Sequence, residues 1–352
     1  MSEAVARYLL VNGLVEKQRF NDYDGELRTV ALYAKNREEW VITDLACVLA
    51  GFTAVTLYDT LGKESLEYIL DQTKIKTVFC SAEKIKSLLD LRKESKIPTT
   101  THIVYFDEAK QADKDLAAQY GVTLIPFATA VEEGKSMTVK FDNVTRDTVY
   151  TICYTSGTTG MPKGAVLTQG NFTSNIGGIN KFDGVFTFYP DDVYISYLPL
   201  AHVFERYIMT SCLAYTVAYG FFGGDVLKLK DDLAELKPTV FVSVPRLFTR
   251  FYDVMQSKIN ELTGMKRTLT DWGIQKKLYN LENYARYNHT FYDALIFSKF
   301  REFLGGRVRH MITGSAPISK EILNFLKIAF CCPINEGYGQ TECAAAASLT
   351  WS

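Results

Sequence analysis

The stretch YTSGTTGMPKG, residues 154–164, directly follows the apolar run VYTIC at 149–153. Three glycines, a lysine and several small hydroxyl side chains stand within these eleven positions. Glycine lets a ligand approach the backbone, and successive free N–H groups with hydroxyls form a concave anion site when a strand holds their stem. The stretch therefore predicts a phosphate-binding loop at the end of a strand.

Two well-known phosphate loops do not fit this stretch. A Walker loop needs Gly-Lys followed by Ser or Thr, whereas Lys163 follows a proline and precedes Gly164. The spacing of Gly157, Gly160 and Gly164 does not match the dinucleotide pattern G-x-G-x-x-G. A surface turn rich in Ser, Thr and Gly is the alternative from these residues alone. A second glycine-rich motif far downstream favours the phosphate loop.

Composition limits the class of protein. The chain has 352 residues, of which 47% are apolar and 13% aromatic, enough for one large α/β unit or two domains. Its net charge of −1 gives no sign of nucleic-acid binding. The seven cysteines include no C-x-x-C pair and the four histidines are scattered, so no zinc site is expected. Unpatterned thiols favour a reducing, intracellular compartment.

No targeting or membrane-spanning segment is expected. The first twenty residues, MSEAVARYLLVNGLVEKQRF, carry Glu3 and lack a small-residue cleavage site after an apolar core, so they make a poor secretory signal. The longest apolar stretch, at 45–58, is shorter than the roughly 20 residues that a membrane span needs. We therefore expect an intracellular, cytoplasmic protein.

Strand-like and helix-like runs alternate along the first part of the chain. The run at 36–51 is a predicted helix between predicted strands at 28–34 and 52–58, and Asn36 and Glu39 have the spacing of a capping box. Such alternation implies parallel strands with helical crossovers, an α/β fold. The same pattern continues with helices and strands predicted at 62–74, 76–80, 82–95 and 101–107.

A second series of elements begins at the run 149–155. A helix is predicted to begin at Pro245, because proline is favoured at the first helical position. We interpret the whole as one continuous α/β body, with possible subdomains 1–150 and 151–352. The other predicted elements are strands at 192–199, 239–244 and 307–315, an apolar helix at 203–220 and helices within 255–303.

The second glycine motif, EGYGQTE at 336–342, makes a specific pair with YTSGTTGMPKG. Together they resemble the adenylate-forming, or AMP-binding, superfamily of acyl-CoA synthetases, luciferases and peptide-synthetase adenylation domains. The resemblance covers nearly the whole chain and implies the large N-terminal domain of that fold, with parallel sheets and crossover helices in layered βα subdomains. Four further segments are most similar to eukaryotic long-chain fatty acyl-CoA synthetases: NREEW (36–40), LYDTLG (57–62), LPLAHVFER (198–206) and TGSAPIS (313–319).

The resemblance implies a two-step reaction. A carboxylate attacks the α-phosphate of Mg·ATP to give acyl-AMP and pyrophosphate, and the thiol of coenzyme A then displaces AMP. The implied ligands are thus ATP, Mg²⁺, coenzyme A and a long-chain fatty acid. Charge that spreads over the phosphates requires hydrogen-bond donors and a cation rather than a covalent intermediate on the protein.

The family pattern assigns phosphate and metal roles to residues of the two motifs. Lys163 is expected to anchor the loop or its ligand, and the alternative is a solvated surface lysine. Tyr338 is expected to stack on adenine, Thr341 to bind the α-phosphate, and Glu342 to bind Mg²⁺, which Thr155 shares. A core aromatic and a helix-start acid are the alternatives for Tyr338 and Glu342. The β- and γ-phosphates are expected to be bound by Thr155, Ser156, Gly157, Thr158 and Thr159.

The same resemblance predicts an adenine pocket and a histidine beside the reacting carboxylate. Many family members have glycine where this chain has Ser315. His202 is expected to donate from a neutral imidazole to the developing charge, and the alternative is a structural histidine. The residues expected around the nucleotide are Gly314, Ser315, Ala316, Glu336, Gly337 and Gly339.

Two features of the sequence bear on the acyl substrate: a missing aspartate and an apolar run. LPLAHVFER offers no aspartate to hold an α-amino group, which favours an unaminated acid. The run CLAYTVAYGFFGG, residues 212–224, is suited either to an alkyl tunnel or to the core.

Family members continue beyond the point where this sequence stops, with a Tyr-x-Thr-Gly-Asp segment and a lid domain that carries a catalytic lysine. We therefore expect an incomplete long-chain fatty acid–CoA ligase of reduced activity, with the C-terminal lid absent. A non-catalytic nucleotide- or acyl-binding fragment is the second hypothesis. An amidase-like hydrolase that uses Lys163 is the third, and EGYGQTE argues against it. Peripheral association with the endoplasmic reticulum or another organelle membrane is also implied by the resemblance.

Overall fold

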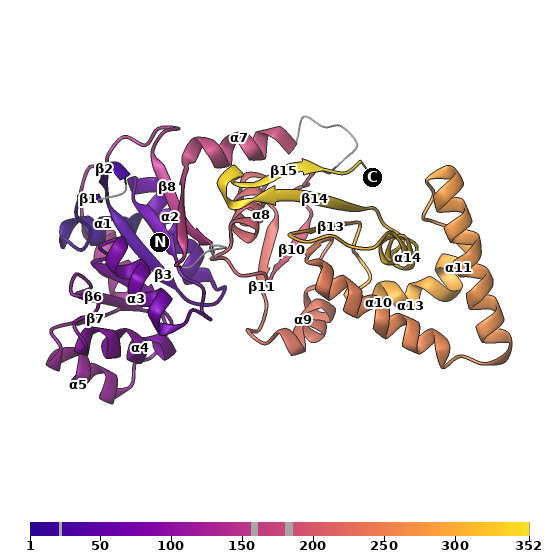
Figure 1. Ribbon diagram of the computed structural model, residues 1–352, viewed down its shortest axis with the longest axis horizontal. Helices are drawn as coiled ribbons and strands as arrows, with labels where there is room; N and C mark the ends of the chain where they lie inside the picture. The colour runs from indigo at the N-terminus through magenta and orange to yellow at the C-terminus, as the bar shows by residue number, and fades with distance from the viewer. Residues whose placement is uncertain (21–22, 156–160, 180–185, 352) are drawn as a thin grey trace. The chain divides into compact units, whose positions relative to one another are not determined.

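The computed structural model describes residues 1–20, 23–155, 161–179 and 186–351 (Figure 1). Its backbone divides into two compact units, each described here by itself. The first comprises Met1–Ser174 with Pro199–Arg206, and the second comprises Asn175–Leu198 with Tyr207–Ser352. The run at 149–155, with which the second predicted series of elements begins, lies in the first unit.

The first unit is built on a seven-stranded sheet of order β7-β6-β5-β3-β4-β8-β9. Its strands are mostly short buried runs rich in β-branched residues, the pattern of a parallel sheet covered on both faces. The neighbours pair in parallel, as predicted, except that β9 at the edge is antiparallel to β8. The bounds are β3 Thr29–Tyr33, β4 Thr53–Thr56, β5 Thr77–Cys80, β6 His102–Tyr105, β7 Thr123–Pro126, β8 Val149–Thr155 and β9 Lys163–Thr168.

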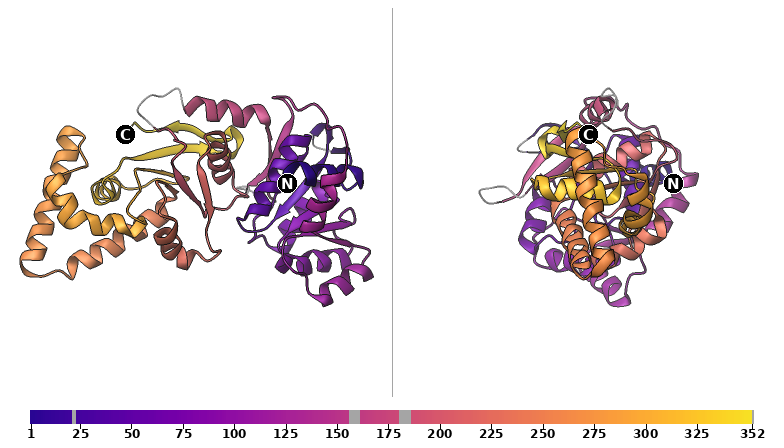
Figure 2. Two further views of the ribbon diagram at one scale, coloured as in Figure 1. Left: turned by 180° about the vertical axis from the view of Figure 1, so that it is seen from behind. Right: turned by 90° about the vertical axis from the view of Figure 1, so that its right-hand side faces the viewer.

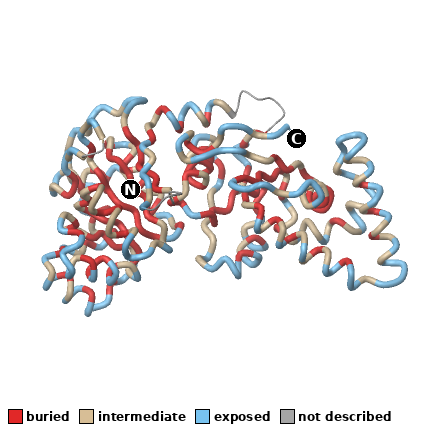
Figure 3. Tube along the Cα trace, viewed as in Figure 1, coloured by how far each residue is buried: buried red, intermediate tan, exposed pale blue. Residues whose placement is uncertain are grey.

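Helices surround the strands of this sheet (Figures 1 and 2), and the strands form the buried centre of the unit (Figure 3). Helices α1 and α6 approach closely at Gly134, where a Cβ would lie 2.0 Å from the carbonyl oxygen of Ala4. A two-stranded antiparallel sheet, β1 Gln18–Phe20 with β2 Tyr23–Leu27, completes the unit. The helices are α1 Ser2–Val11, α2 Glu38–Ala50, α3 Lys63–Gln72, α4 Ala82–Lys93, α5 Gln111–Gln119, α6 Phe127–Ser136 and α7 Gln169–Ile179, whose residues from 175 on belong to the second unit.

The predicted capping box at the start of α2 is wrong. The helix begins at Glu38, and its N-cap Arg37 makes no side-chain capping hydrogen bond. The side chain of Asn36 instead accepts a hydrogen bond from the backbone N–H of Leu200, at 2.9 Å. The Asn36 side chain therefore makes a tertiary hydrogen bond instead of the helix cap that the local pattern predicted.

The second unit is built on a six-stranded sheet of order β11-β10-β12-β13-β14-β15. Neighbours are again parallel, except that β15 runs antiparallel to β14. Among the described residues, no helix is both long and apolar enough to cross a membrane. The strands are β10 Val193–Ser196, β11 Ala218–Phe221, β12 Val240–Ser243, β13 His310–Gly314, β14 Ile334–Gln340 and β15 Ala345–Leu349.

The helices of this part correct one prediction and confirm another. The helix predicted over 203–220 is too long: α8 ends at Ala214, Thr216 takes a left-handed φ of 57°, and β11 follows. An apolar run suits a helix and a strand equally, so the sequence did not mark this break. Pro245 occupies the start of its helix as predicted. The α-helices are α8 Val203–Ala214, whose first four residues belong to the first unit, α9 Leu229–Leu236, α10 Pro245–Asn260, α11 Gly264–Tyr284, α12 Thr290–Tyr292, α13 Ser298–Arg301 and α14 Lys320–Phe330.

Candidate functional site

The stem of the predicted phosphate loop is an antiparallel hairpin in the first unit. Thr155 ends β8 and Lys163 begins β9; the two are register partners, and the Thr155 hydroxyl donates to the Lys163 carbonyl oxygen at 3.4 Å. Thr155 is half-buried and Lys163 is exposed. Ser156, Gly157, Thr158 and Thr159 lie outside the described residues, so their roles stay predictions.

Glycine is required at the base of this hairpin. A Cβ at Gly164 would lie 2.7 Å from Cγ2 of Ile152 and 3.1 Å from Cζ of Tyr154, both on the neighbouring strand. The Tyr154 hydroxyl donates to the side-chain oxygen of Gln72 at 2.6 Å. The strand that leads into the loop is therefore held by packing and by a side-chain hydrogen bond.

His202 stands immediately before α8 in a defined orientation. Its Nδ1 accepts a hydrogen bond from the backbone N–H of Phe204 at 3.1 Å, and its carbonyl accepts from the N–H of Arg206 at 3.2 Å. Burial lowers the pKa of His202, which favours the neutral imidazole. Because Nδ1 is an acceptor, the ring proton lies on Nε2. The side chain thus offers one N–H donor, as the predicted role requires.

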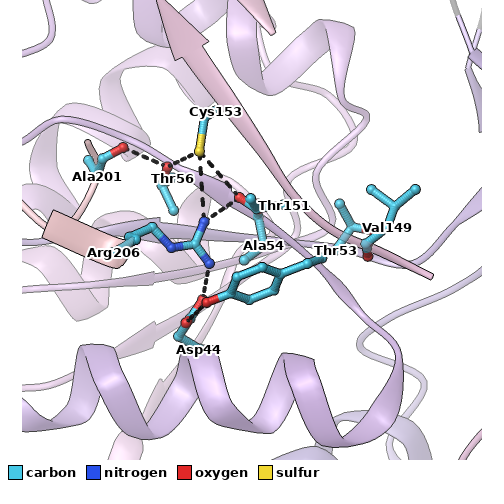
Figure 4. A network of polar contacts seen from close by, with 10 residues as sticks. Asp44, Thr53, Ala54, Thr56, Val149, Thr151, Cys153, Ala201 and Arg206 are labelled. Atoms are coloured by element: carbon cyan, nitrogen blue, oxygen red, sulfur yellow. Dashed lines mark hydrogen bonds and ion pairs between the residues drawn. The ribbon is translucent and has the colours of Figure 1, made fainter. Parts of the chain in front are cut away.

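A buried ion pair lies one helical turn beyond His202 (Figure 4). Arg206 and Asp44 are both fully buried and paired, Arg206 also donates to the hydroxyl of Thr151, and the Tyr150 hydroxyl donates to Asp44. The guanidinium also lies over the ring of Tyr150, 4.3 Å from its centre. This network joins the start of α8 to α2 and β8.

Arg206 is the last residue of LPLAHVFER, and no role was predicted for it from the sequence. The available signal was an adjacent acid and base, Glu205 and Arg206, inside an otherwise apolar run. Both are fully buried. Charged residues are almost never fully buried unless they are paired, so their place in an apolar run pointed to a buried partner.

The predicted adenine-binding residues lie together in the second unit. β13 and β14 are parallel neighbours in which Thr313 pairs with Glu336 and Gly314 with Gly337. Ser315 follows directly with a left-handed φ of 73°, a conformation that explains why glycine suits this position. Ala316 is exposed beside it. The arrangement places these residues where β13 ends, the usual ligand edge of a parallel sheet.

The motif EGYGQTE forms β14 and the turn after it. A Cβ at Gly339 would lie 1.5 Å from the carbonyl oxygen of Ala345 on β15, so only glycine fits. The Tyr338 side chain is 67% exposed, which contradicts the core alternative and leaves its ring available for stacking. Thr341 and Glu342 begin the 3₁₀ turn Thr341–Cys343 (η4), where Thr341 is half-buried and Glu342 is exposed.

The oxygen groups of Thr341 and Glu342 are suited to Mg²⁺ that is bound together with a nucleotide. In the part of the chain that the structure describes, no three His, Cys, Asp or Glu side chains gather as a metal site. Mg²⁺ commonly binds through one or two carboxylates together with substrate phosphates and water. The exposed carboxylate of Glu342, next to the Thr341 hydroxyl, is compatible with that mode.

A chain of hydrogen bonds holds the backbone of Glu336 in place. His310 donates from Nε2 to the side-chain oxygen of Asn335, whose amide donates to the Thr350 carbonyl at 2.6 Å. The Glu336 N–H donates to the Thr350 hydroxyl at 2.8 Å, and the Thr350 N–H donates to the Glu336 carbonyl at 2.9 Å. The backbone of the first EGYGQTE residue is therefore tied to the chain after β15.

The buried histidine of this network predicts a pH dependence of stability. Burial lowers the pKa of His310 from 6.5 to about 4, so the unfolded chain binds more protons between these values. Stability is therefore complete above about pH 6.5 and is lost as the pH falls toward 4. We expect a loss of about 2 kcal/mol between about pH 7 and pH 5, measured by urea unfolding.

The matched control for this pH effect is His310→Gln, which removes the titrating ring. Its unfolding free energy should change with pH by much less than that of the wild type, whatever its value at neutral pH. Equal pH slopes in the two proteins would show that His310 is not the group responsible.

Comparison with known proteins identifies the family of the chain. The family model described as AMP-binding enzyme matches residues 1–352. The chain is 41% identical over 313 residues to the peroxisomal long chain acyl-CoA synthetase 7 of Arabidopsis thaliana, covering 89% of this chain and 44% of that protein. It is 39% identical over 323 residues to the human long-chain-fatty-acid–CoA ligase 1, covering 91% and 46%. The chain thus spans about half the length of these curated relatives.

Solved structures show the same fold at lower sequence identity. The adenylation domain of a carboxylate reductase from Mycobacterium chelonae superposes with a TM-score of 0.78 at 21% identity, covering 99% of this chain and 50% of that one. The N-terminal domain of FACL13 from Mycobacterium tuberculosis gives a TM-score of 0.66 at 18% identity, covering 99% and 69%. With the family model matched along the whole sequence, the chain belongs to the AMP-binding enzyme family.

Proposed function

We propose that this chain takes part in the activation of a long-chain fatty acid by Mg·ATP, with an acyl-adenylate intermediate and coenzyme A as the final acceptor. The observation that carries the proposal is His202: a neutral imidazole whose Nδ1 is already bound and whose Nε2 carries the proton. Support also comes from the relatives, two of which are named as long-chain acyl-CoA synthetase and long-chain-fatty-acid–CoA ligase. One relative is named as peroxisomal, which supports the proposal that this chain acts at an organelle.

Each of the chain's own groups has a part in this reaction. The Nε2–H of His202 donates to the oxygen that gains charge as the acid carboxylate attacks the α-phosphorus and pyrophosphate leaves. The Thr341 hydroxyl donates to the α-phosphate. Tyr338 provides an exposed ring for adenine, and Gly314, Gly337 and Ser315 allow the base to approach the backbone. Glu342 would hold Mg²⁺, which neutralises phosphate charge when it is bound.

Loop residues complete the proposed phosphate site. The stem formed by Thr155 and Lys163 holds the ends of the segment that contains Ser156, Gly157, Thr158 and Thr159. We propose that this segment binds the β- and γ-phosphates and that Lys163 anchors the loop or its ligand. Ala316, Glu336 and Gly339 are assigned to the nucleotide pocket.

A survey of acids tests both the reaction and the substrate class. The protein as its gene encodes it is assayed by hydroxamate trapping and by ATP–pyrophosphate exchange, with acetate, octanoate, palmitate, stearate and several amino acids. We expect palmitate and stearate to give the highest kcat/KM, since each buried methylene contributes roughly 0.8 kcal/mol of binding. Preference for acetate or an amino acid would contradict the long-chain assignment. ATP binding by calorimetry without exchange for any acid would favour a nucleotide-binding protein without this catalysis.

A further inference from the structure

The two peptide units that precede His202 are held by side chains from elsewhere in the first unit. The N–H of Leu200 donates to Oδ1 of Asn36 at 2.9 Å, and the hydroxyl of Thr56 donates to the carbonyl oxygen of Ala201 at 3.0 Å. Asn36 is 8% exposed and Thr56 is 1% exposed. Figure 4 shows the hydroxyl of Thr56 directed at Ala201. Both hydrogen bonds are therefore buried contacts between segments far apart in the sequence.

Both side chains make hydrogen bonds to a segment far from their own position in the sequence. Asn36 lies between β3 and α2 but does not cap the helix, and Thr56 is the last residue of β4. β3 and β4 are neighbours in the sheet, so the two anchors come from adjacent strand ends. On the other side of His202, Arg206 is tied to Asp44 in the buried ion pair. The backbone is thus fixed just before the histidine and one turn after it.

This anchoring limits how the imidazole can move. With the peptides of Leu200 and Ala201 held and Nδ1 bound to the Phe204 N–H, the direction of Nε2–H is set by the protein rather than by the substrate. Misplacing a catalytic group by about 1 Å can lower a rate by about 10²-fold, so such anchoring has a direct catalytic effect.

We propose that Asn36 and Thr56 are positioning residues that aim the Nε2–H of His202 at the charge that develops beside the reacting carboxylate. The proposal rests on the proposed function and adds the assignment of NREEW: the segment supplies an anchor for the histidine turn. Thr56 gives the sharper test, because Thr→Val replaces the hydroxyl with a methyl group of similar size and Thr→Ser retains the hydroxyl.

The kinetic test compares Thr56→Val with Thr56→Ser, each with and without His202→Ala. We expect Thr56→Val to lower kcat for palmitate-dependent pyrophosphate exchange about tenfold with KM for ATP nearly unchanged, and Thr56→Ser to stay near wild type. In the His202→Ala background, Thr56→Val should change kcat less than about twofold, because the group it positions is gone. An equal loss in both backgrounds would overturn the proposal by showing a merely structural role.

A spectroscopic readout keeps the test independent of turnover. The protein has four histidines, and His202→Ala assigns the ring signals of His202 in a ¹⁵N-labelled sample. The wild type should show the Nε2–H tautomer, and Thr56→Val should shift or broaden the His202 signals while Thr56→Ser leaves them in place. Unchanged signals in folded Thr56→Val would overturn the proposal. A wild type that shows this tautomer and this response but forms no adenylate would instead contradict the proposed function.

Discussion

Replacing Glu342 with alanine is expected to lower the rate of acyl-adenylate formation by about 10²–10³-fold, the usual loss when one electrostatic stabiliser is removed. The carboxylate is exposed beside Thr341, so we propose that it binds the ligand and contributes little to the stability of the fold. Removing it takes away the oxygen ligand that would fix Mg²⁺ against the α-phosphate. The measurement is pyrophosphate exchange with palmitate over a range of Mg²⁺ concentrations.

Two control variants separate the metal role from a loss of folding. Glu342→Asp keeps a carboxylate and should retain part of the rate, with a higher Mg²⁺ requirement. Glu261→Ala removes an exposed carboxylate at the end of α10, in the same unit, and should leave exchange unchanged. A Glu342→Ala protein that exchanges pyrophosphate within about threefold of wild type would exclude the metal role, because an electrostatic stabiliser contributes far more than that.

The strands of both sheets were predictable where their sequences are short apolar runs bounded by polar segments. β3, β4, β5 and β6 are such runs, and burial between layers of helices leaves few other options for them. The strands at the edges of the two sheets were harder to predict. β9 and β15 pair antiparallel with their neighbours, and an edge strand with exposed positions does not carry the same signal.

The site was predictable where short motifs carry it. Gly314 lies on the strand next to that of Glu336 and Gly337, and Ser315 directly follows Gly314, which is the proximity that the family pattern implied. The anchors of His202 were not predictable, because a hydrogen bond such as that of Asn36 to Leu200 joins residues 164 positions apart. Local spacing assigned Asn36 to a capping box, but its side-chain oxygen instead accepts a hydrogen bond from the backbone N–H of Leu200.

Replacing Arg206 with methionine is expected to lower the free energy of unfolding by about 3–5 kcal/mol, the loss found when one partner of a buried ion pair is removed. The side chains of Arg206 and Asp44 have no exposed surface, so water cannot replace the missing partner. The measurement is urea unfolding followed by circular dichroism and by tryptophan fluorescence. Arg19→Met is the matched control, because its 3.2 Å pair with Glu26 is largely exposed and should contribute less than about 1 kcal/mol.

A combined variant decides whether this loss comes from an uncompensated charge or from lost packing. Asp44→Leu with Tyr150→Phe, added to Arg206→Met, removes the carboxylate and the hydroxyl that donates to it, while Thr151 keeps its hydrogen bond to the Ala54 carbonyl at 2.6 Å. If the unpaired carboxylate causes the loss, the triple variant should regain about half of it or more, because apolar groups of similar volume often replace a buried ion pair without a penalty. If the triple variant is no more stable than Arg206→Met alone, the loss comes instead from the stacking of the guanidinium on the rings of Tyr150 and Trp40, whose centres lie 4.3 and 5.5 Å away. A loss below about 1 kcal/mol for Arg206→Met itself would show that the buried pair does not anchor α8. Breaking an ion pair with no exposed surface should lower the free energy of unfolding by more than that.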